Sequence, residues 1–86
     1  MKKYLGTITI LIKDRQANVE TLQNVLTENG HFIRSRLGIN VEPTCMAHCL
    51  GFMVLAVEGT AEEINFLTEK LSNLQGIIAK STIVSD

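Results

Sequence analysis

The sequence predicts one α+β domain with the element order βαββαβ, for two reasons. Segments in which apolar and polar residues alternate, which is typical of strands, flank two segments whose apolar residues recur at three- and four-residue spacing, which is typical of amphipathic helices. The two halves also echo each other, because the predicted helix starts, Asp14 and Thr60, have the same offset as the predicted helix ends, Gly30 and Gly76. With 86 residues the chain is large enough for a single core, so we expect one domain over residues 1–86.

The first strand is predicted over residues 4–13, and the first helix follows it directly. β-branched residues dominate this strand, and its isoleucines share one face. Asp14 is a suitable N-cap because its carboxylate can accept hydrogen bonds from the free N–H groups of the first turn. We expect Asn29-Gly30 to end the helix in the left-handed conformation. The apolar stripe of the helix is Val19, Leu22, Val25 and Leu26.

The next two strands differ in the polarity of their faces. Residues 31–42 alternate, so we expect one face of this strand to be hydrated. The predicted apolar face is Ile33, Leu37, Ile39 and Val41 with Ser35, and the predicted polar face is Arg34, Arg36, Asn40 and Glu42. Residues 50–58 are apolar on both faces, as in a strand at the centre of a sheet. Residues 42–49 form the hairpin connection between the two strands.

The second helix begins with a capping box, in which Thr60 and Glu63 each satisfy a free backbone N–H group of the other residue. We expect Gly76 to end this helix region and residues 77–84 to form the last strand. The apolar stripe of the helix is Ile64, Leu67, Leu71 and Leu74.

This element order predicts a ferredoxin-like sandwich, because right-handed crossovers place both helices on one face of a four-stranded antiparallel sheet with strand order 4-1-3-2. We expect the second face of the sheet to be too apolar to stay in water. The residues that we assign to this face include Tyr4, Met53, Leu55 and Val57. A small domain also gains stability by association. We therefore expect a homodimer or homotetramer.

Residues 12–39 resemble the ACT family of small regulatory domains. In that family a strand ends in Asp-Arg-Pro-Gly, and a Gly-x-x-Ile step opens the second strand after a helix; here Asp14-Arg15 and the step from Gly30 to Ile33 match, whereas Gln16-Ala17 replaces Pro-Gly. The resemblance implies a regulatory domain that binds a small-molecule effector. Free N–H groups at a helix start favour an anionic effector. The predicted effector-binding residues are Asp14, Arg15, Gln16 and Asn18.

The whole chain is more closely similar to the stand-alone, ACT-like family of iron-only hydrogenase system regulators, through its length, the Lys13-Asp14-Arg15 turn and Arg36-Leu37-Gly38. This resemblance implies a role in hydrogenase maturation or transcriptional regulation. The family is in turn similar to the C-terminal domain of the nickel-responsive repressor, a tetramer that binds nickel through histidines and one cysteine. Cys49 matches that cysteine, but no histidine stands where the repressor has its His-x-His step.

The loop before the third strand contains Cys45, His48 and Cys49, and three hypotheses for it stay open. Thiolates and an imidazole are good ligands for nickel or zinc, so these residues are candidate ligands of a metal-sensing module, with Glu42, His31 or a second subunit as the fourth ligand. Alternatively, the two thiols pair under oxidation in a redox-responsive interaction protein. The blandest hypothesis, which the C-x-x-H-C spacing favours, is a hairpin connection with buried cysteines.

Charge and motifs exclude several functional classes. The net charge of −1 and the lack of a basic cluster longer than Lys2-Lys3 argue against direct binding of nucleic acid. No apolar run approaches the ~20 residues of a membrane helix, and the N-terminus is a poor secretion signal, so we expect a cytoplasmic protein with reduced cysteines. No Ser-His-Asp set, paired carboxylates or glycine-rich phosphate loop is present, so we do not expect an enzyme.

Overall fold

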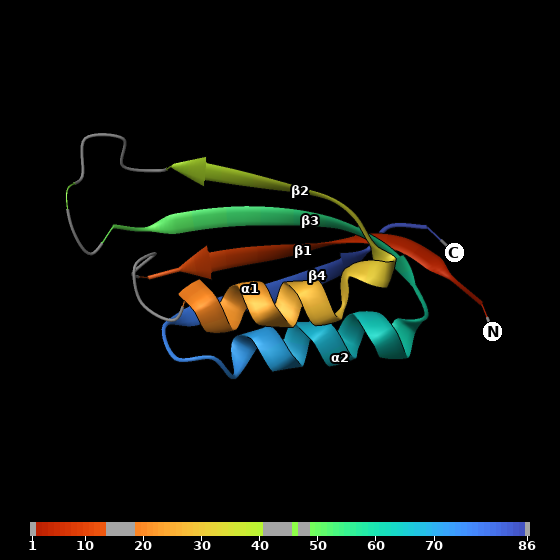
Figure 1. The fold of residues 1–86 in the computed structure, drawn as a ribbon. Helices are drawn as coiled ribbons and strands as arrows, with labels where there is room; N and C mark the ends of the chain where they lie inside the picture. Colours follow the sequence, from red (N-terminus) through yellow and green to blue (C-terminus); the bar gives the residue numbers. More distant parts are fainter. Residues whose placement is uncertain (1, 14–18, 41–45, 47–48, 86) are drawn as a thin grey trace.

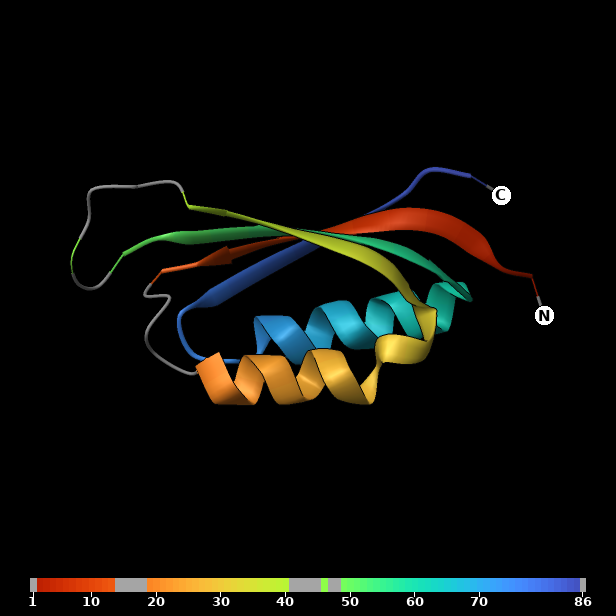
Figure 2. The same cartoon turned by 45° about the horizontal axis from the view of Figure 1, so that its top comes forward.

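The protein folds into two layers, a four-stranded antiparallel sheet and a pair of helices on one of its faces (Figure 1; Figure 2). The computed structural model describes residues 2–13, 19–40, 46 and 49–85. Its helices and strands are β1 (Tyr4–Ile12), α1 (Val19–Glu28), the 3₁₀ turn η1 (Gly30–Phe32), β2 (Ile33–Asn40), β3 (Gly51–Gly59), α2 (Ala61–Ser72) and β4 (Ile77–Ile83). The predicted βαββαβ order and the ferredoxin-like sandwich are confirmed.

The strands lie in the order β2-β3-β1-β4, which is the predicted order read from the other edge. β1 and β3 form the centre and pair along their whole lengths, from Tyr4 opposite Gly59 to Ile12 opposite Gly51. Within the described ranges, no helix has the length and hydropathy to cross a bilayer.

The core lies between the sheet and the helices. Alternate residues of β1 and β3 point toward the helices, where they are fully or almost fully buried. Ile64, Leu67 and Leu71 of α2 meet them, and each has 0% of its surface exposed. Because Met53, Leu55 and Val57 belong to this buried set, these three residues do not contribute to the open face of the sheet.

A β-bulge in β2 contradicts part of the predicted face assignment. Ile33 lies opposite Val57, whereas Ser35 lies opposite Ala56, so Arg34 is an extra residue that reverses the alternation. Ile33 consequently packs against the core, on the opposite face from Leu37 and Ile39. The sequence pattern could not reveal this bulge, because a strict period of two runs through it.

The helix ends agree only partly with the predictions. The capping box of α2 is present: the Thr60 N–H donates to Glu63 Oε1 at 2.9 Å, and the Glu63 N–H donates to Thr60 Oγ1 at 3.1 Å. Gly76 has the predicted left-handed backbone, with φ 77°. The same prediction was wrong for Asn29-Gly30, because Asn29 has φ −111° and the chain continues into η1. The Asn29 side chain instead caps α1 by donating from Nδ2 to the Val25 carbonyl at 2.8 Å.

Candidate functional site

The predicted effector-binding residues, Asp14, Arg15, Gln16 and Asn18, lie outside the described residues. The fold places the ends of that segment, because β1 finishes at Ile12 and α1 begins at Val19. The Lys13 N–H donates to the Gly76 carbonyl at 2.8 Å, so the end of β1 lies beside the connection between α2 and β4. The effector site therefore stays a prediction.

Two of the three candidate metal ligands, Cys45 and His48, also lie outside the described residues, as does Glu42. Cys49 lies just before β3, is fully buried and is disulfide-bonded, which differs from the reduced thiol that we expected. Within the described ranges, no group of three or more His, Cys, Asp and Glu side chains is arranged to hold a metal ion. A disulfide sulfur offers no thiolate, so the metal hypothesis concerns the reduced protein.

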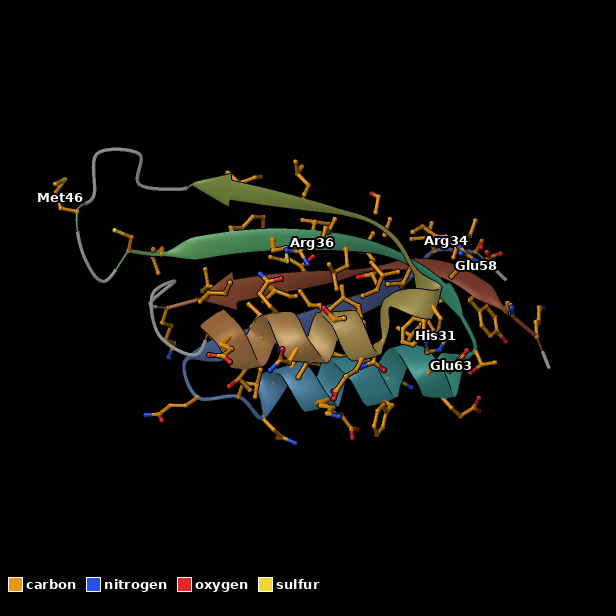
Figure 3. All side chains as sticks on the ribbon, viewed as in Figure 1. His31, Arg34, Arg36, Met46, Glu58 and Glu63 are labelled. Carbon is orange, nitrogen blue, oxygen red and sulfur yellow. The ribbon has the colours of Figure 1, made fainter. Side chains whose placement is uncertain are left out.

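His31, a candidate fourth ligand, lies in η1 and contacts the start of α2. Its Nε2 atom is 3.6 Å from Glu63 Oε2, and its ring packs edge-on against Phe32 with 4.8 Å between ring centroids. Figure 3 shows both members of this pair at the end of the molecule opposite Met46. The Thr60 N–H, and to a smaller extent the Thr60 hydroxyl and His31, lower the pKa of Glu63 below its ordinary value, although partial desolvation opposes them.

A shallow groove of about 310 Å³ runs beside this pair, between η1 and α2. It is lined by Asn29, His31, Phe32, Glu62, Glu63 and Phe66. The sequence pattern does not reveal this groove, because its two walls are separated by β2 and β3 along the chain. The one available signal was Phe66, an aromatic residue outside the apolar stripe of α2.

The two arginines of β2 make contacts within the chain, although we expected a hydrated face. Arg34, the extra residue of the bulge, donates from Nε and Nη2 to Glu58 Oε1 at 3.2 and 2.8 Å. Arg36 lies opposite Leu55, on the helix-covered face, and donates from Nη2 to Gln23 Oε1 of α1 at 2.9 Å. Both side chains remain solvent-accessible. Arg36 thus connects an edge strand to α1.

The face of the sheet away from the helices carries an apolar surface, which we name the open-face patch. Register aligns one residue from each strand in a row across the sheet, in the order Ile39, Phe52, Leu11, Ile78. Leu37 and Val54 extend the row on β2 and β3. The open-face patch therefore comprises Leu11, Leu37, Ile39, Phe52, Val54 and Ile78. Leu37 is 60% exposed, and Ile39 and Ile78 are also exposed.

The adjoining half of the open face is more polar. In the next row, Leu37 and Val54 are followed by Thr9 and Lys80, and the row after it consists of Ser35, Ala56, Thr7 and Thr82. The prediction of an apolar second face is therefore correct for one half of that face, but with different residues from those that we named, because Tyr4, Met53, Leu55 and Val57 lie on the helix-covered side. A contiguous apolar patch beside a polar one is typical of an interaction surface.

Comparison with solved structures shows that the chain has an ACT-like fold. The ACT domain of GTP pyrophosphokinase from Chlorobium tepidum superposes with a TM-score of 0.72 at 16% identity, over 94% of this chain and 100% of that one. CPII, a nitrogen regulatory PII-like protein from Thiomonas intermedia K12 solved with ADP, AMP and bicarbonate, superposes with a TM-score of 0.58 at 18% identity, over 99% and 100%. At these identities the similarity establishes the fold.

Within this class, the chain belongs to the TM1266-like family, described as "Iron-only hydrogenase system regulator, putative", whose model matches residues 4–81. TM1266 from Thermotoga maritima superposes with a TM-score of 0.85 at 20% identity, over 98% of this chain and 100% of that one. No curated protein matches the sequence significantly. The family to which we found a resemblance in the sequence is thereby confirmed.

Proposed function

We propose that the protein is a non-enzymatic regulatory domain of an iron-only hydrogenase system, and that it acts as a homo-oligomer that binds a small effector. The description of its family supports a regulatory role. The oligomer forms where two copies place their open-face patches against each other. The effector binds at the segment between β1 and α1, where Asp14, Arg15, Gln16 and Asn18 stand.

The open-face patch is the observation that supports the proposal of a homo-oligomer. Six apolar side chains from all four strands form one continuous surface, and the helices of the same chain cover the opposite face. A second copy supplies an identical apolar surface, so a twofold arrangement buries both patches at once. Removing this area from water stabilises the pair by roughly 25 cal/mol per Å² of apolar surface, before the cost of association.

Analytical ultracentrifugation of matched variants tests the oligomer. Leu37→Lys places a charge in the patch, and we expect it to shift the protein from a dimer or tetramer toward the monomer. Phe66→Lys is the control, because Phe66 is 58% exposed, close to the value for Leu37, but lies on α2. A wild-type protein that sediments as a monomer, or an equal shift in both variants, would contradict the proposal.

The effector part has a separate test. PII-like CPII was solved with two nucleotides and bicarbonate, which are anions, and an anionic ligand suits the start of a helix. A thermal-shift screen of the wild-type protein with amino acids, nucleotides and metal ions should find one selective stabiliser. Arg15→Ala should weaken that stabilisation, whereas Lys80→Ala on the open face should not. A screen without a selective ligand would count against the effector and leave the oligomer intact.

A second candidate function, a thiol redox response, is favoured by the disulfide at Cys49. We expect thiol titration of the denatured protein to detect fewer free thiols after mild peroxide treatment than after reduction. Elemental analysis of the reduced protein, with Cys49→Ser as the comparison, tests the metal-sensing alternative that uses Cys45, His48 and Cys49. Stoichiometric nickel or zinc that is lost in the variant would favour the metal, and metal-free protein with reversible thiol loss would favour the redox response.

A further inference from the structure

The groove between η1 and α2 combines an apolar surface with acidic side chains. Phe32 and Phe66 contribute rings, and Glu62 and Glu63 contribute carboxylates. The volume of the groove, about 310 Å³, lies at the lower limit of small-molecule sites and is sufficient for one long side chain. The two walls come from η1 and α2, which lie on the helical side of the sheet (Figure 2), so a second copy on the open-face patch would not cover the groove.

The charge of this groove is negative. Its lining includes two carboxylates and neither a lysine nor an arginine. Glu63 is partly engaged, because Oε1 accepts from the Thr60 N–H and Oε2 lies 3.6 Å from His31. Glu62 is exposed, and its side chain forms no ion pair or hydrogen bond with any residue in the described part of the chain. A cation that enters the groove therefore finds an uncommitted carboxylate.

Phe66 already accepts a cation from its own chain. Lys70 Nζ lies 5.6 Å from the centroid of the Phe66 ring and 3.7 Å from Glu28 Oε1, so this cation lies between a ring and a carboxylate. The ring face is attractive to a cation because of its quadrupole. Glu62 and Phe66 are four residues apart on α2 and both line the groove, so a second carboxylate lies one helical turn from the same ring.

We propose that this groove binds an arginine side chain of a partner protein, with the guanidinium group between the Glu62 carboxylate and the Phe66 ring. Arginine suits the groove better than lysine, because the planar guanidinium stacks on a ring and donates two parallel hydrogen bonds to a carboxylate. A free amino acid is disfavoured, because its own carboxylate would meet two acidic side chains in a groove that no lysine or arginine lines. This site is additional to the proposed effector site and does not depend on self-association.

Titration of the ¹⁵N-labelled full chain, followed by NMR chemical shifts, tests the proposal with three probes. The probes are acetyl-Gly-Arg-Gly-amide, the same peptide with neutral citrulline in place of arginine, and free L-arginine. We expect saturable shifts with the arginine peptide at the amides of His31, Glu62 and Phe66. The citrulline peptide and free arginine should each bind more weakly than the arginine peptide by roughly two- to fivefold. Citrulline has no positive charge for the carboxylate and the ring, and free arginine brings a carboxylate that the two glutamates repel.

Variants assign the effect to the groove. Glu62→Gln and Phe66→Ala should each weaken binding of the arginine peptide by roughly two- to fivefold. Glu69→Gln is the matched control, because Glu69 is also an exposed glutamate of α2 but does not line the groove. Leu37→Lys should bind the peptide like the wild type, which separates this proposal from self-association. Equal losses of affinity in Glu62→Gln and Glu69→Gln would overturn the proposal. So would a citrulline peptide that binds as well as the arginine peptide, free arginine that binds more tightly than the peptide, or chemical shifts that do not saturate.

Discussion

The helix-covered face of the sheet holds aliphatic side chains that one chain buries completely, whereas the open face holds aliphatic side chains that one chain leaves in contact with water. Leu55 has 0% of its surface exposed and the neighbouring strand's Leu37 has 60%, although both belong to continuous apolar surfaces. The difference lies in what covers each surface. An apolar strand face therefore indicates that the face is buried. Only the fold shows whether the covering surface belongs to the same chain or to another molecule.

Truncation of one leucine on each face should separate the two surfaces most strongly. Leu55→Ala should lower the free energy of unfolding by about 2–5 kcal/mol, because it leaves a cavity under the helices. Leu37→Ala should change it by about 0.5 kcal/mol or less in dilute solution, where the patch is uncovered. Urea unfolding at low protein concentration measures both values. Similar losses for the two variants would show that one chain buries the open face as well.

Removal of the α2 cap should loosen the cover of the buried face. Thr60→Ala deletes the hydroxyl that accepts from the Glu63 N–H at 3.1 Å, and we expect it to cost about 1 kcal/mol of stability. Ser at this position keeps the hydroxyl, so Thr60→Ser should retain most of the stability in the same urea experiment. If Ala and Ser destabilise the protein equally, the loss comes from the methyl group and not from the cap.

The same cap predicts how acid weakens the covered face. The Thr60 N–H, opposed by partial desolvation, lowers the pKa of Glu63 in the folded protein below its ordinary value of 4.5. The unfolded chain therefore takes up a proton first as the pH falls, and the stabilisation, complete above the ordinary pKa, is lost as the pH passes through the folded pKa. Below about pH 5 the wild type should lose more stability than Glu63→Gln, and Glu69→Gln should follow the wild type. Parallel pH profiles for wild type and Glu63→Gln would exclude this linkage.

The ion pair at the polar end of the open face should have the smallest effect. Arg34 and Glu58 are 53% and 38% exposed, so solvent screens their contact at 2.8 Å. A double-mutant cycle with Arg34→Ala and Glu58→Ala should give a coupling energy of about 0.2–1 kcal/mol that decreases with added salt. A larger coupling that salt leaves unchanged would mean that this end of the face is buried in an assembly.

The sequence predicted those parts of the fold that depend on neighbouring residues. The order of elements, the Thr60–Glu63 capping box and the left-handed Gly76 all follow from short-range patterns. The bulge at Arg34 depends on how β2 meets β3, so the assignment of Ile33 to the same face as Leu37 was wrong.

The candidate sites were harder to predict for the same reason. The open-face patch combines residues from four strands, and the groove combines η1 with α2, so both exist only after long-range pairing. Alternation identifies two apolar faces on β3, but it does not say which one the helices cover. Phe66 was recognisable as an aromatic residue outside the helix stripe, yet its neighbours in the groove were not.

An isotope-filtered NOE experiment tests the proposed pairing of the open faces most directly. In a mixture of ¹³C-labelled and unlabelled chains, the self-association model predicts NOEs between subunits that join the methyl groups of Leu37, Ile39 and Ile78 to the ring protons of Phe52. Leu37→Lys should abolish these signals. Contacts between subunits that arise instead from α1 and α2, or a mixed sample without any intermolecular NOE, would contradict the model.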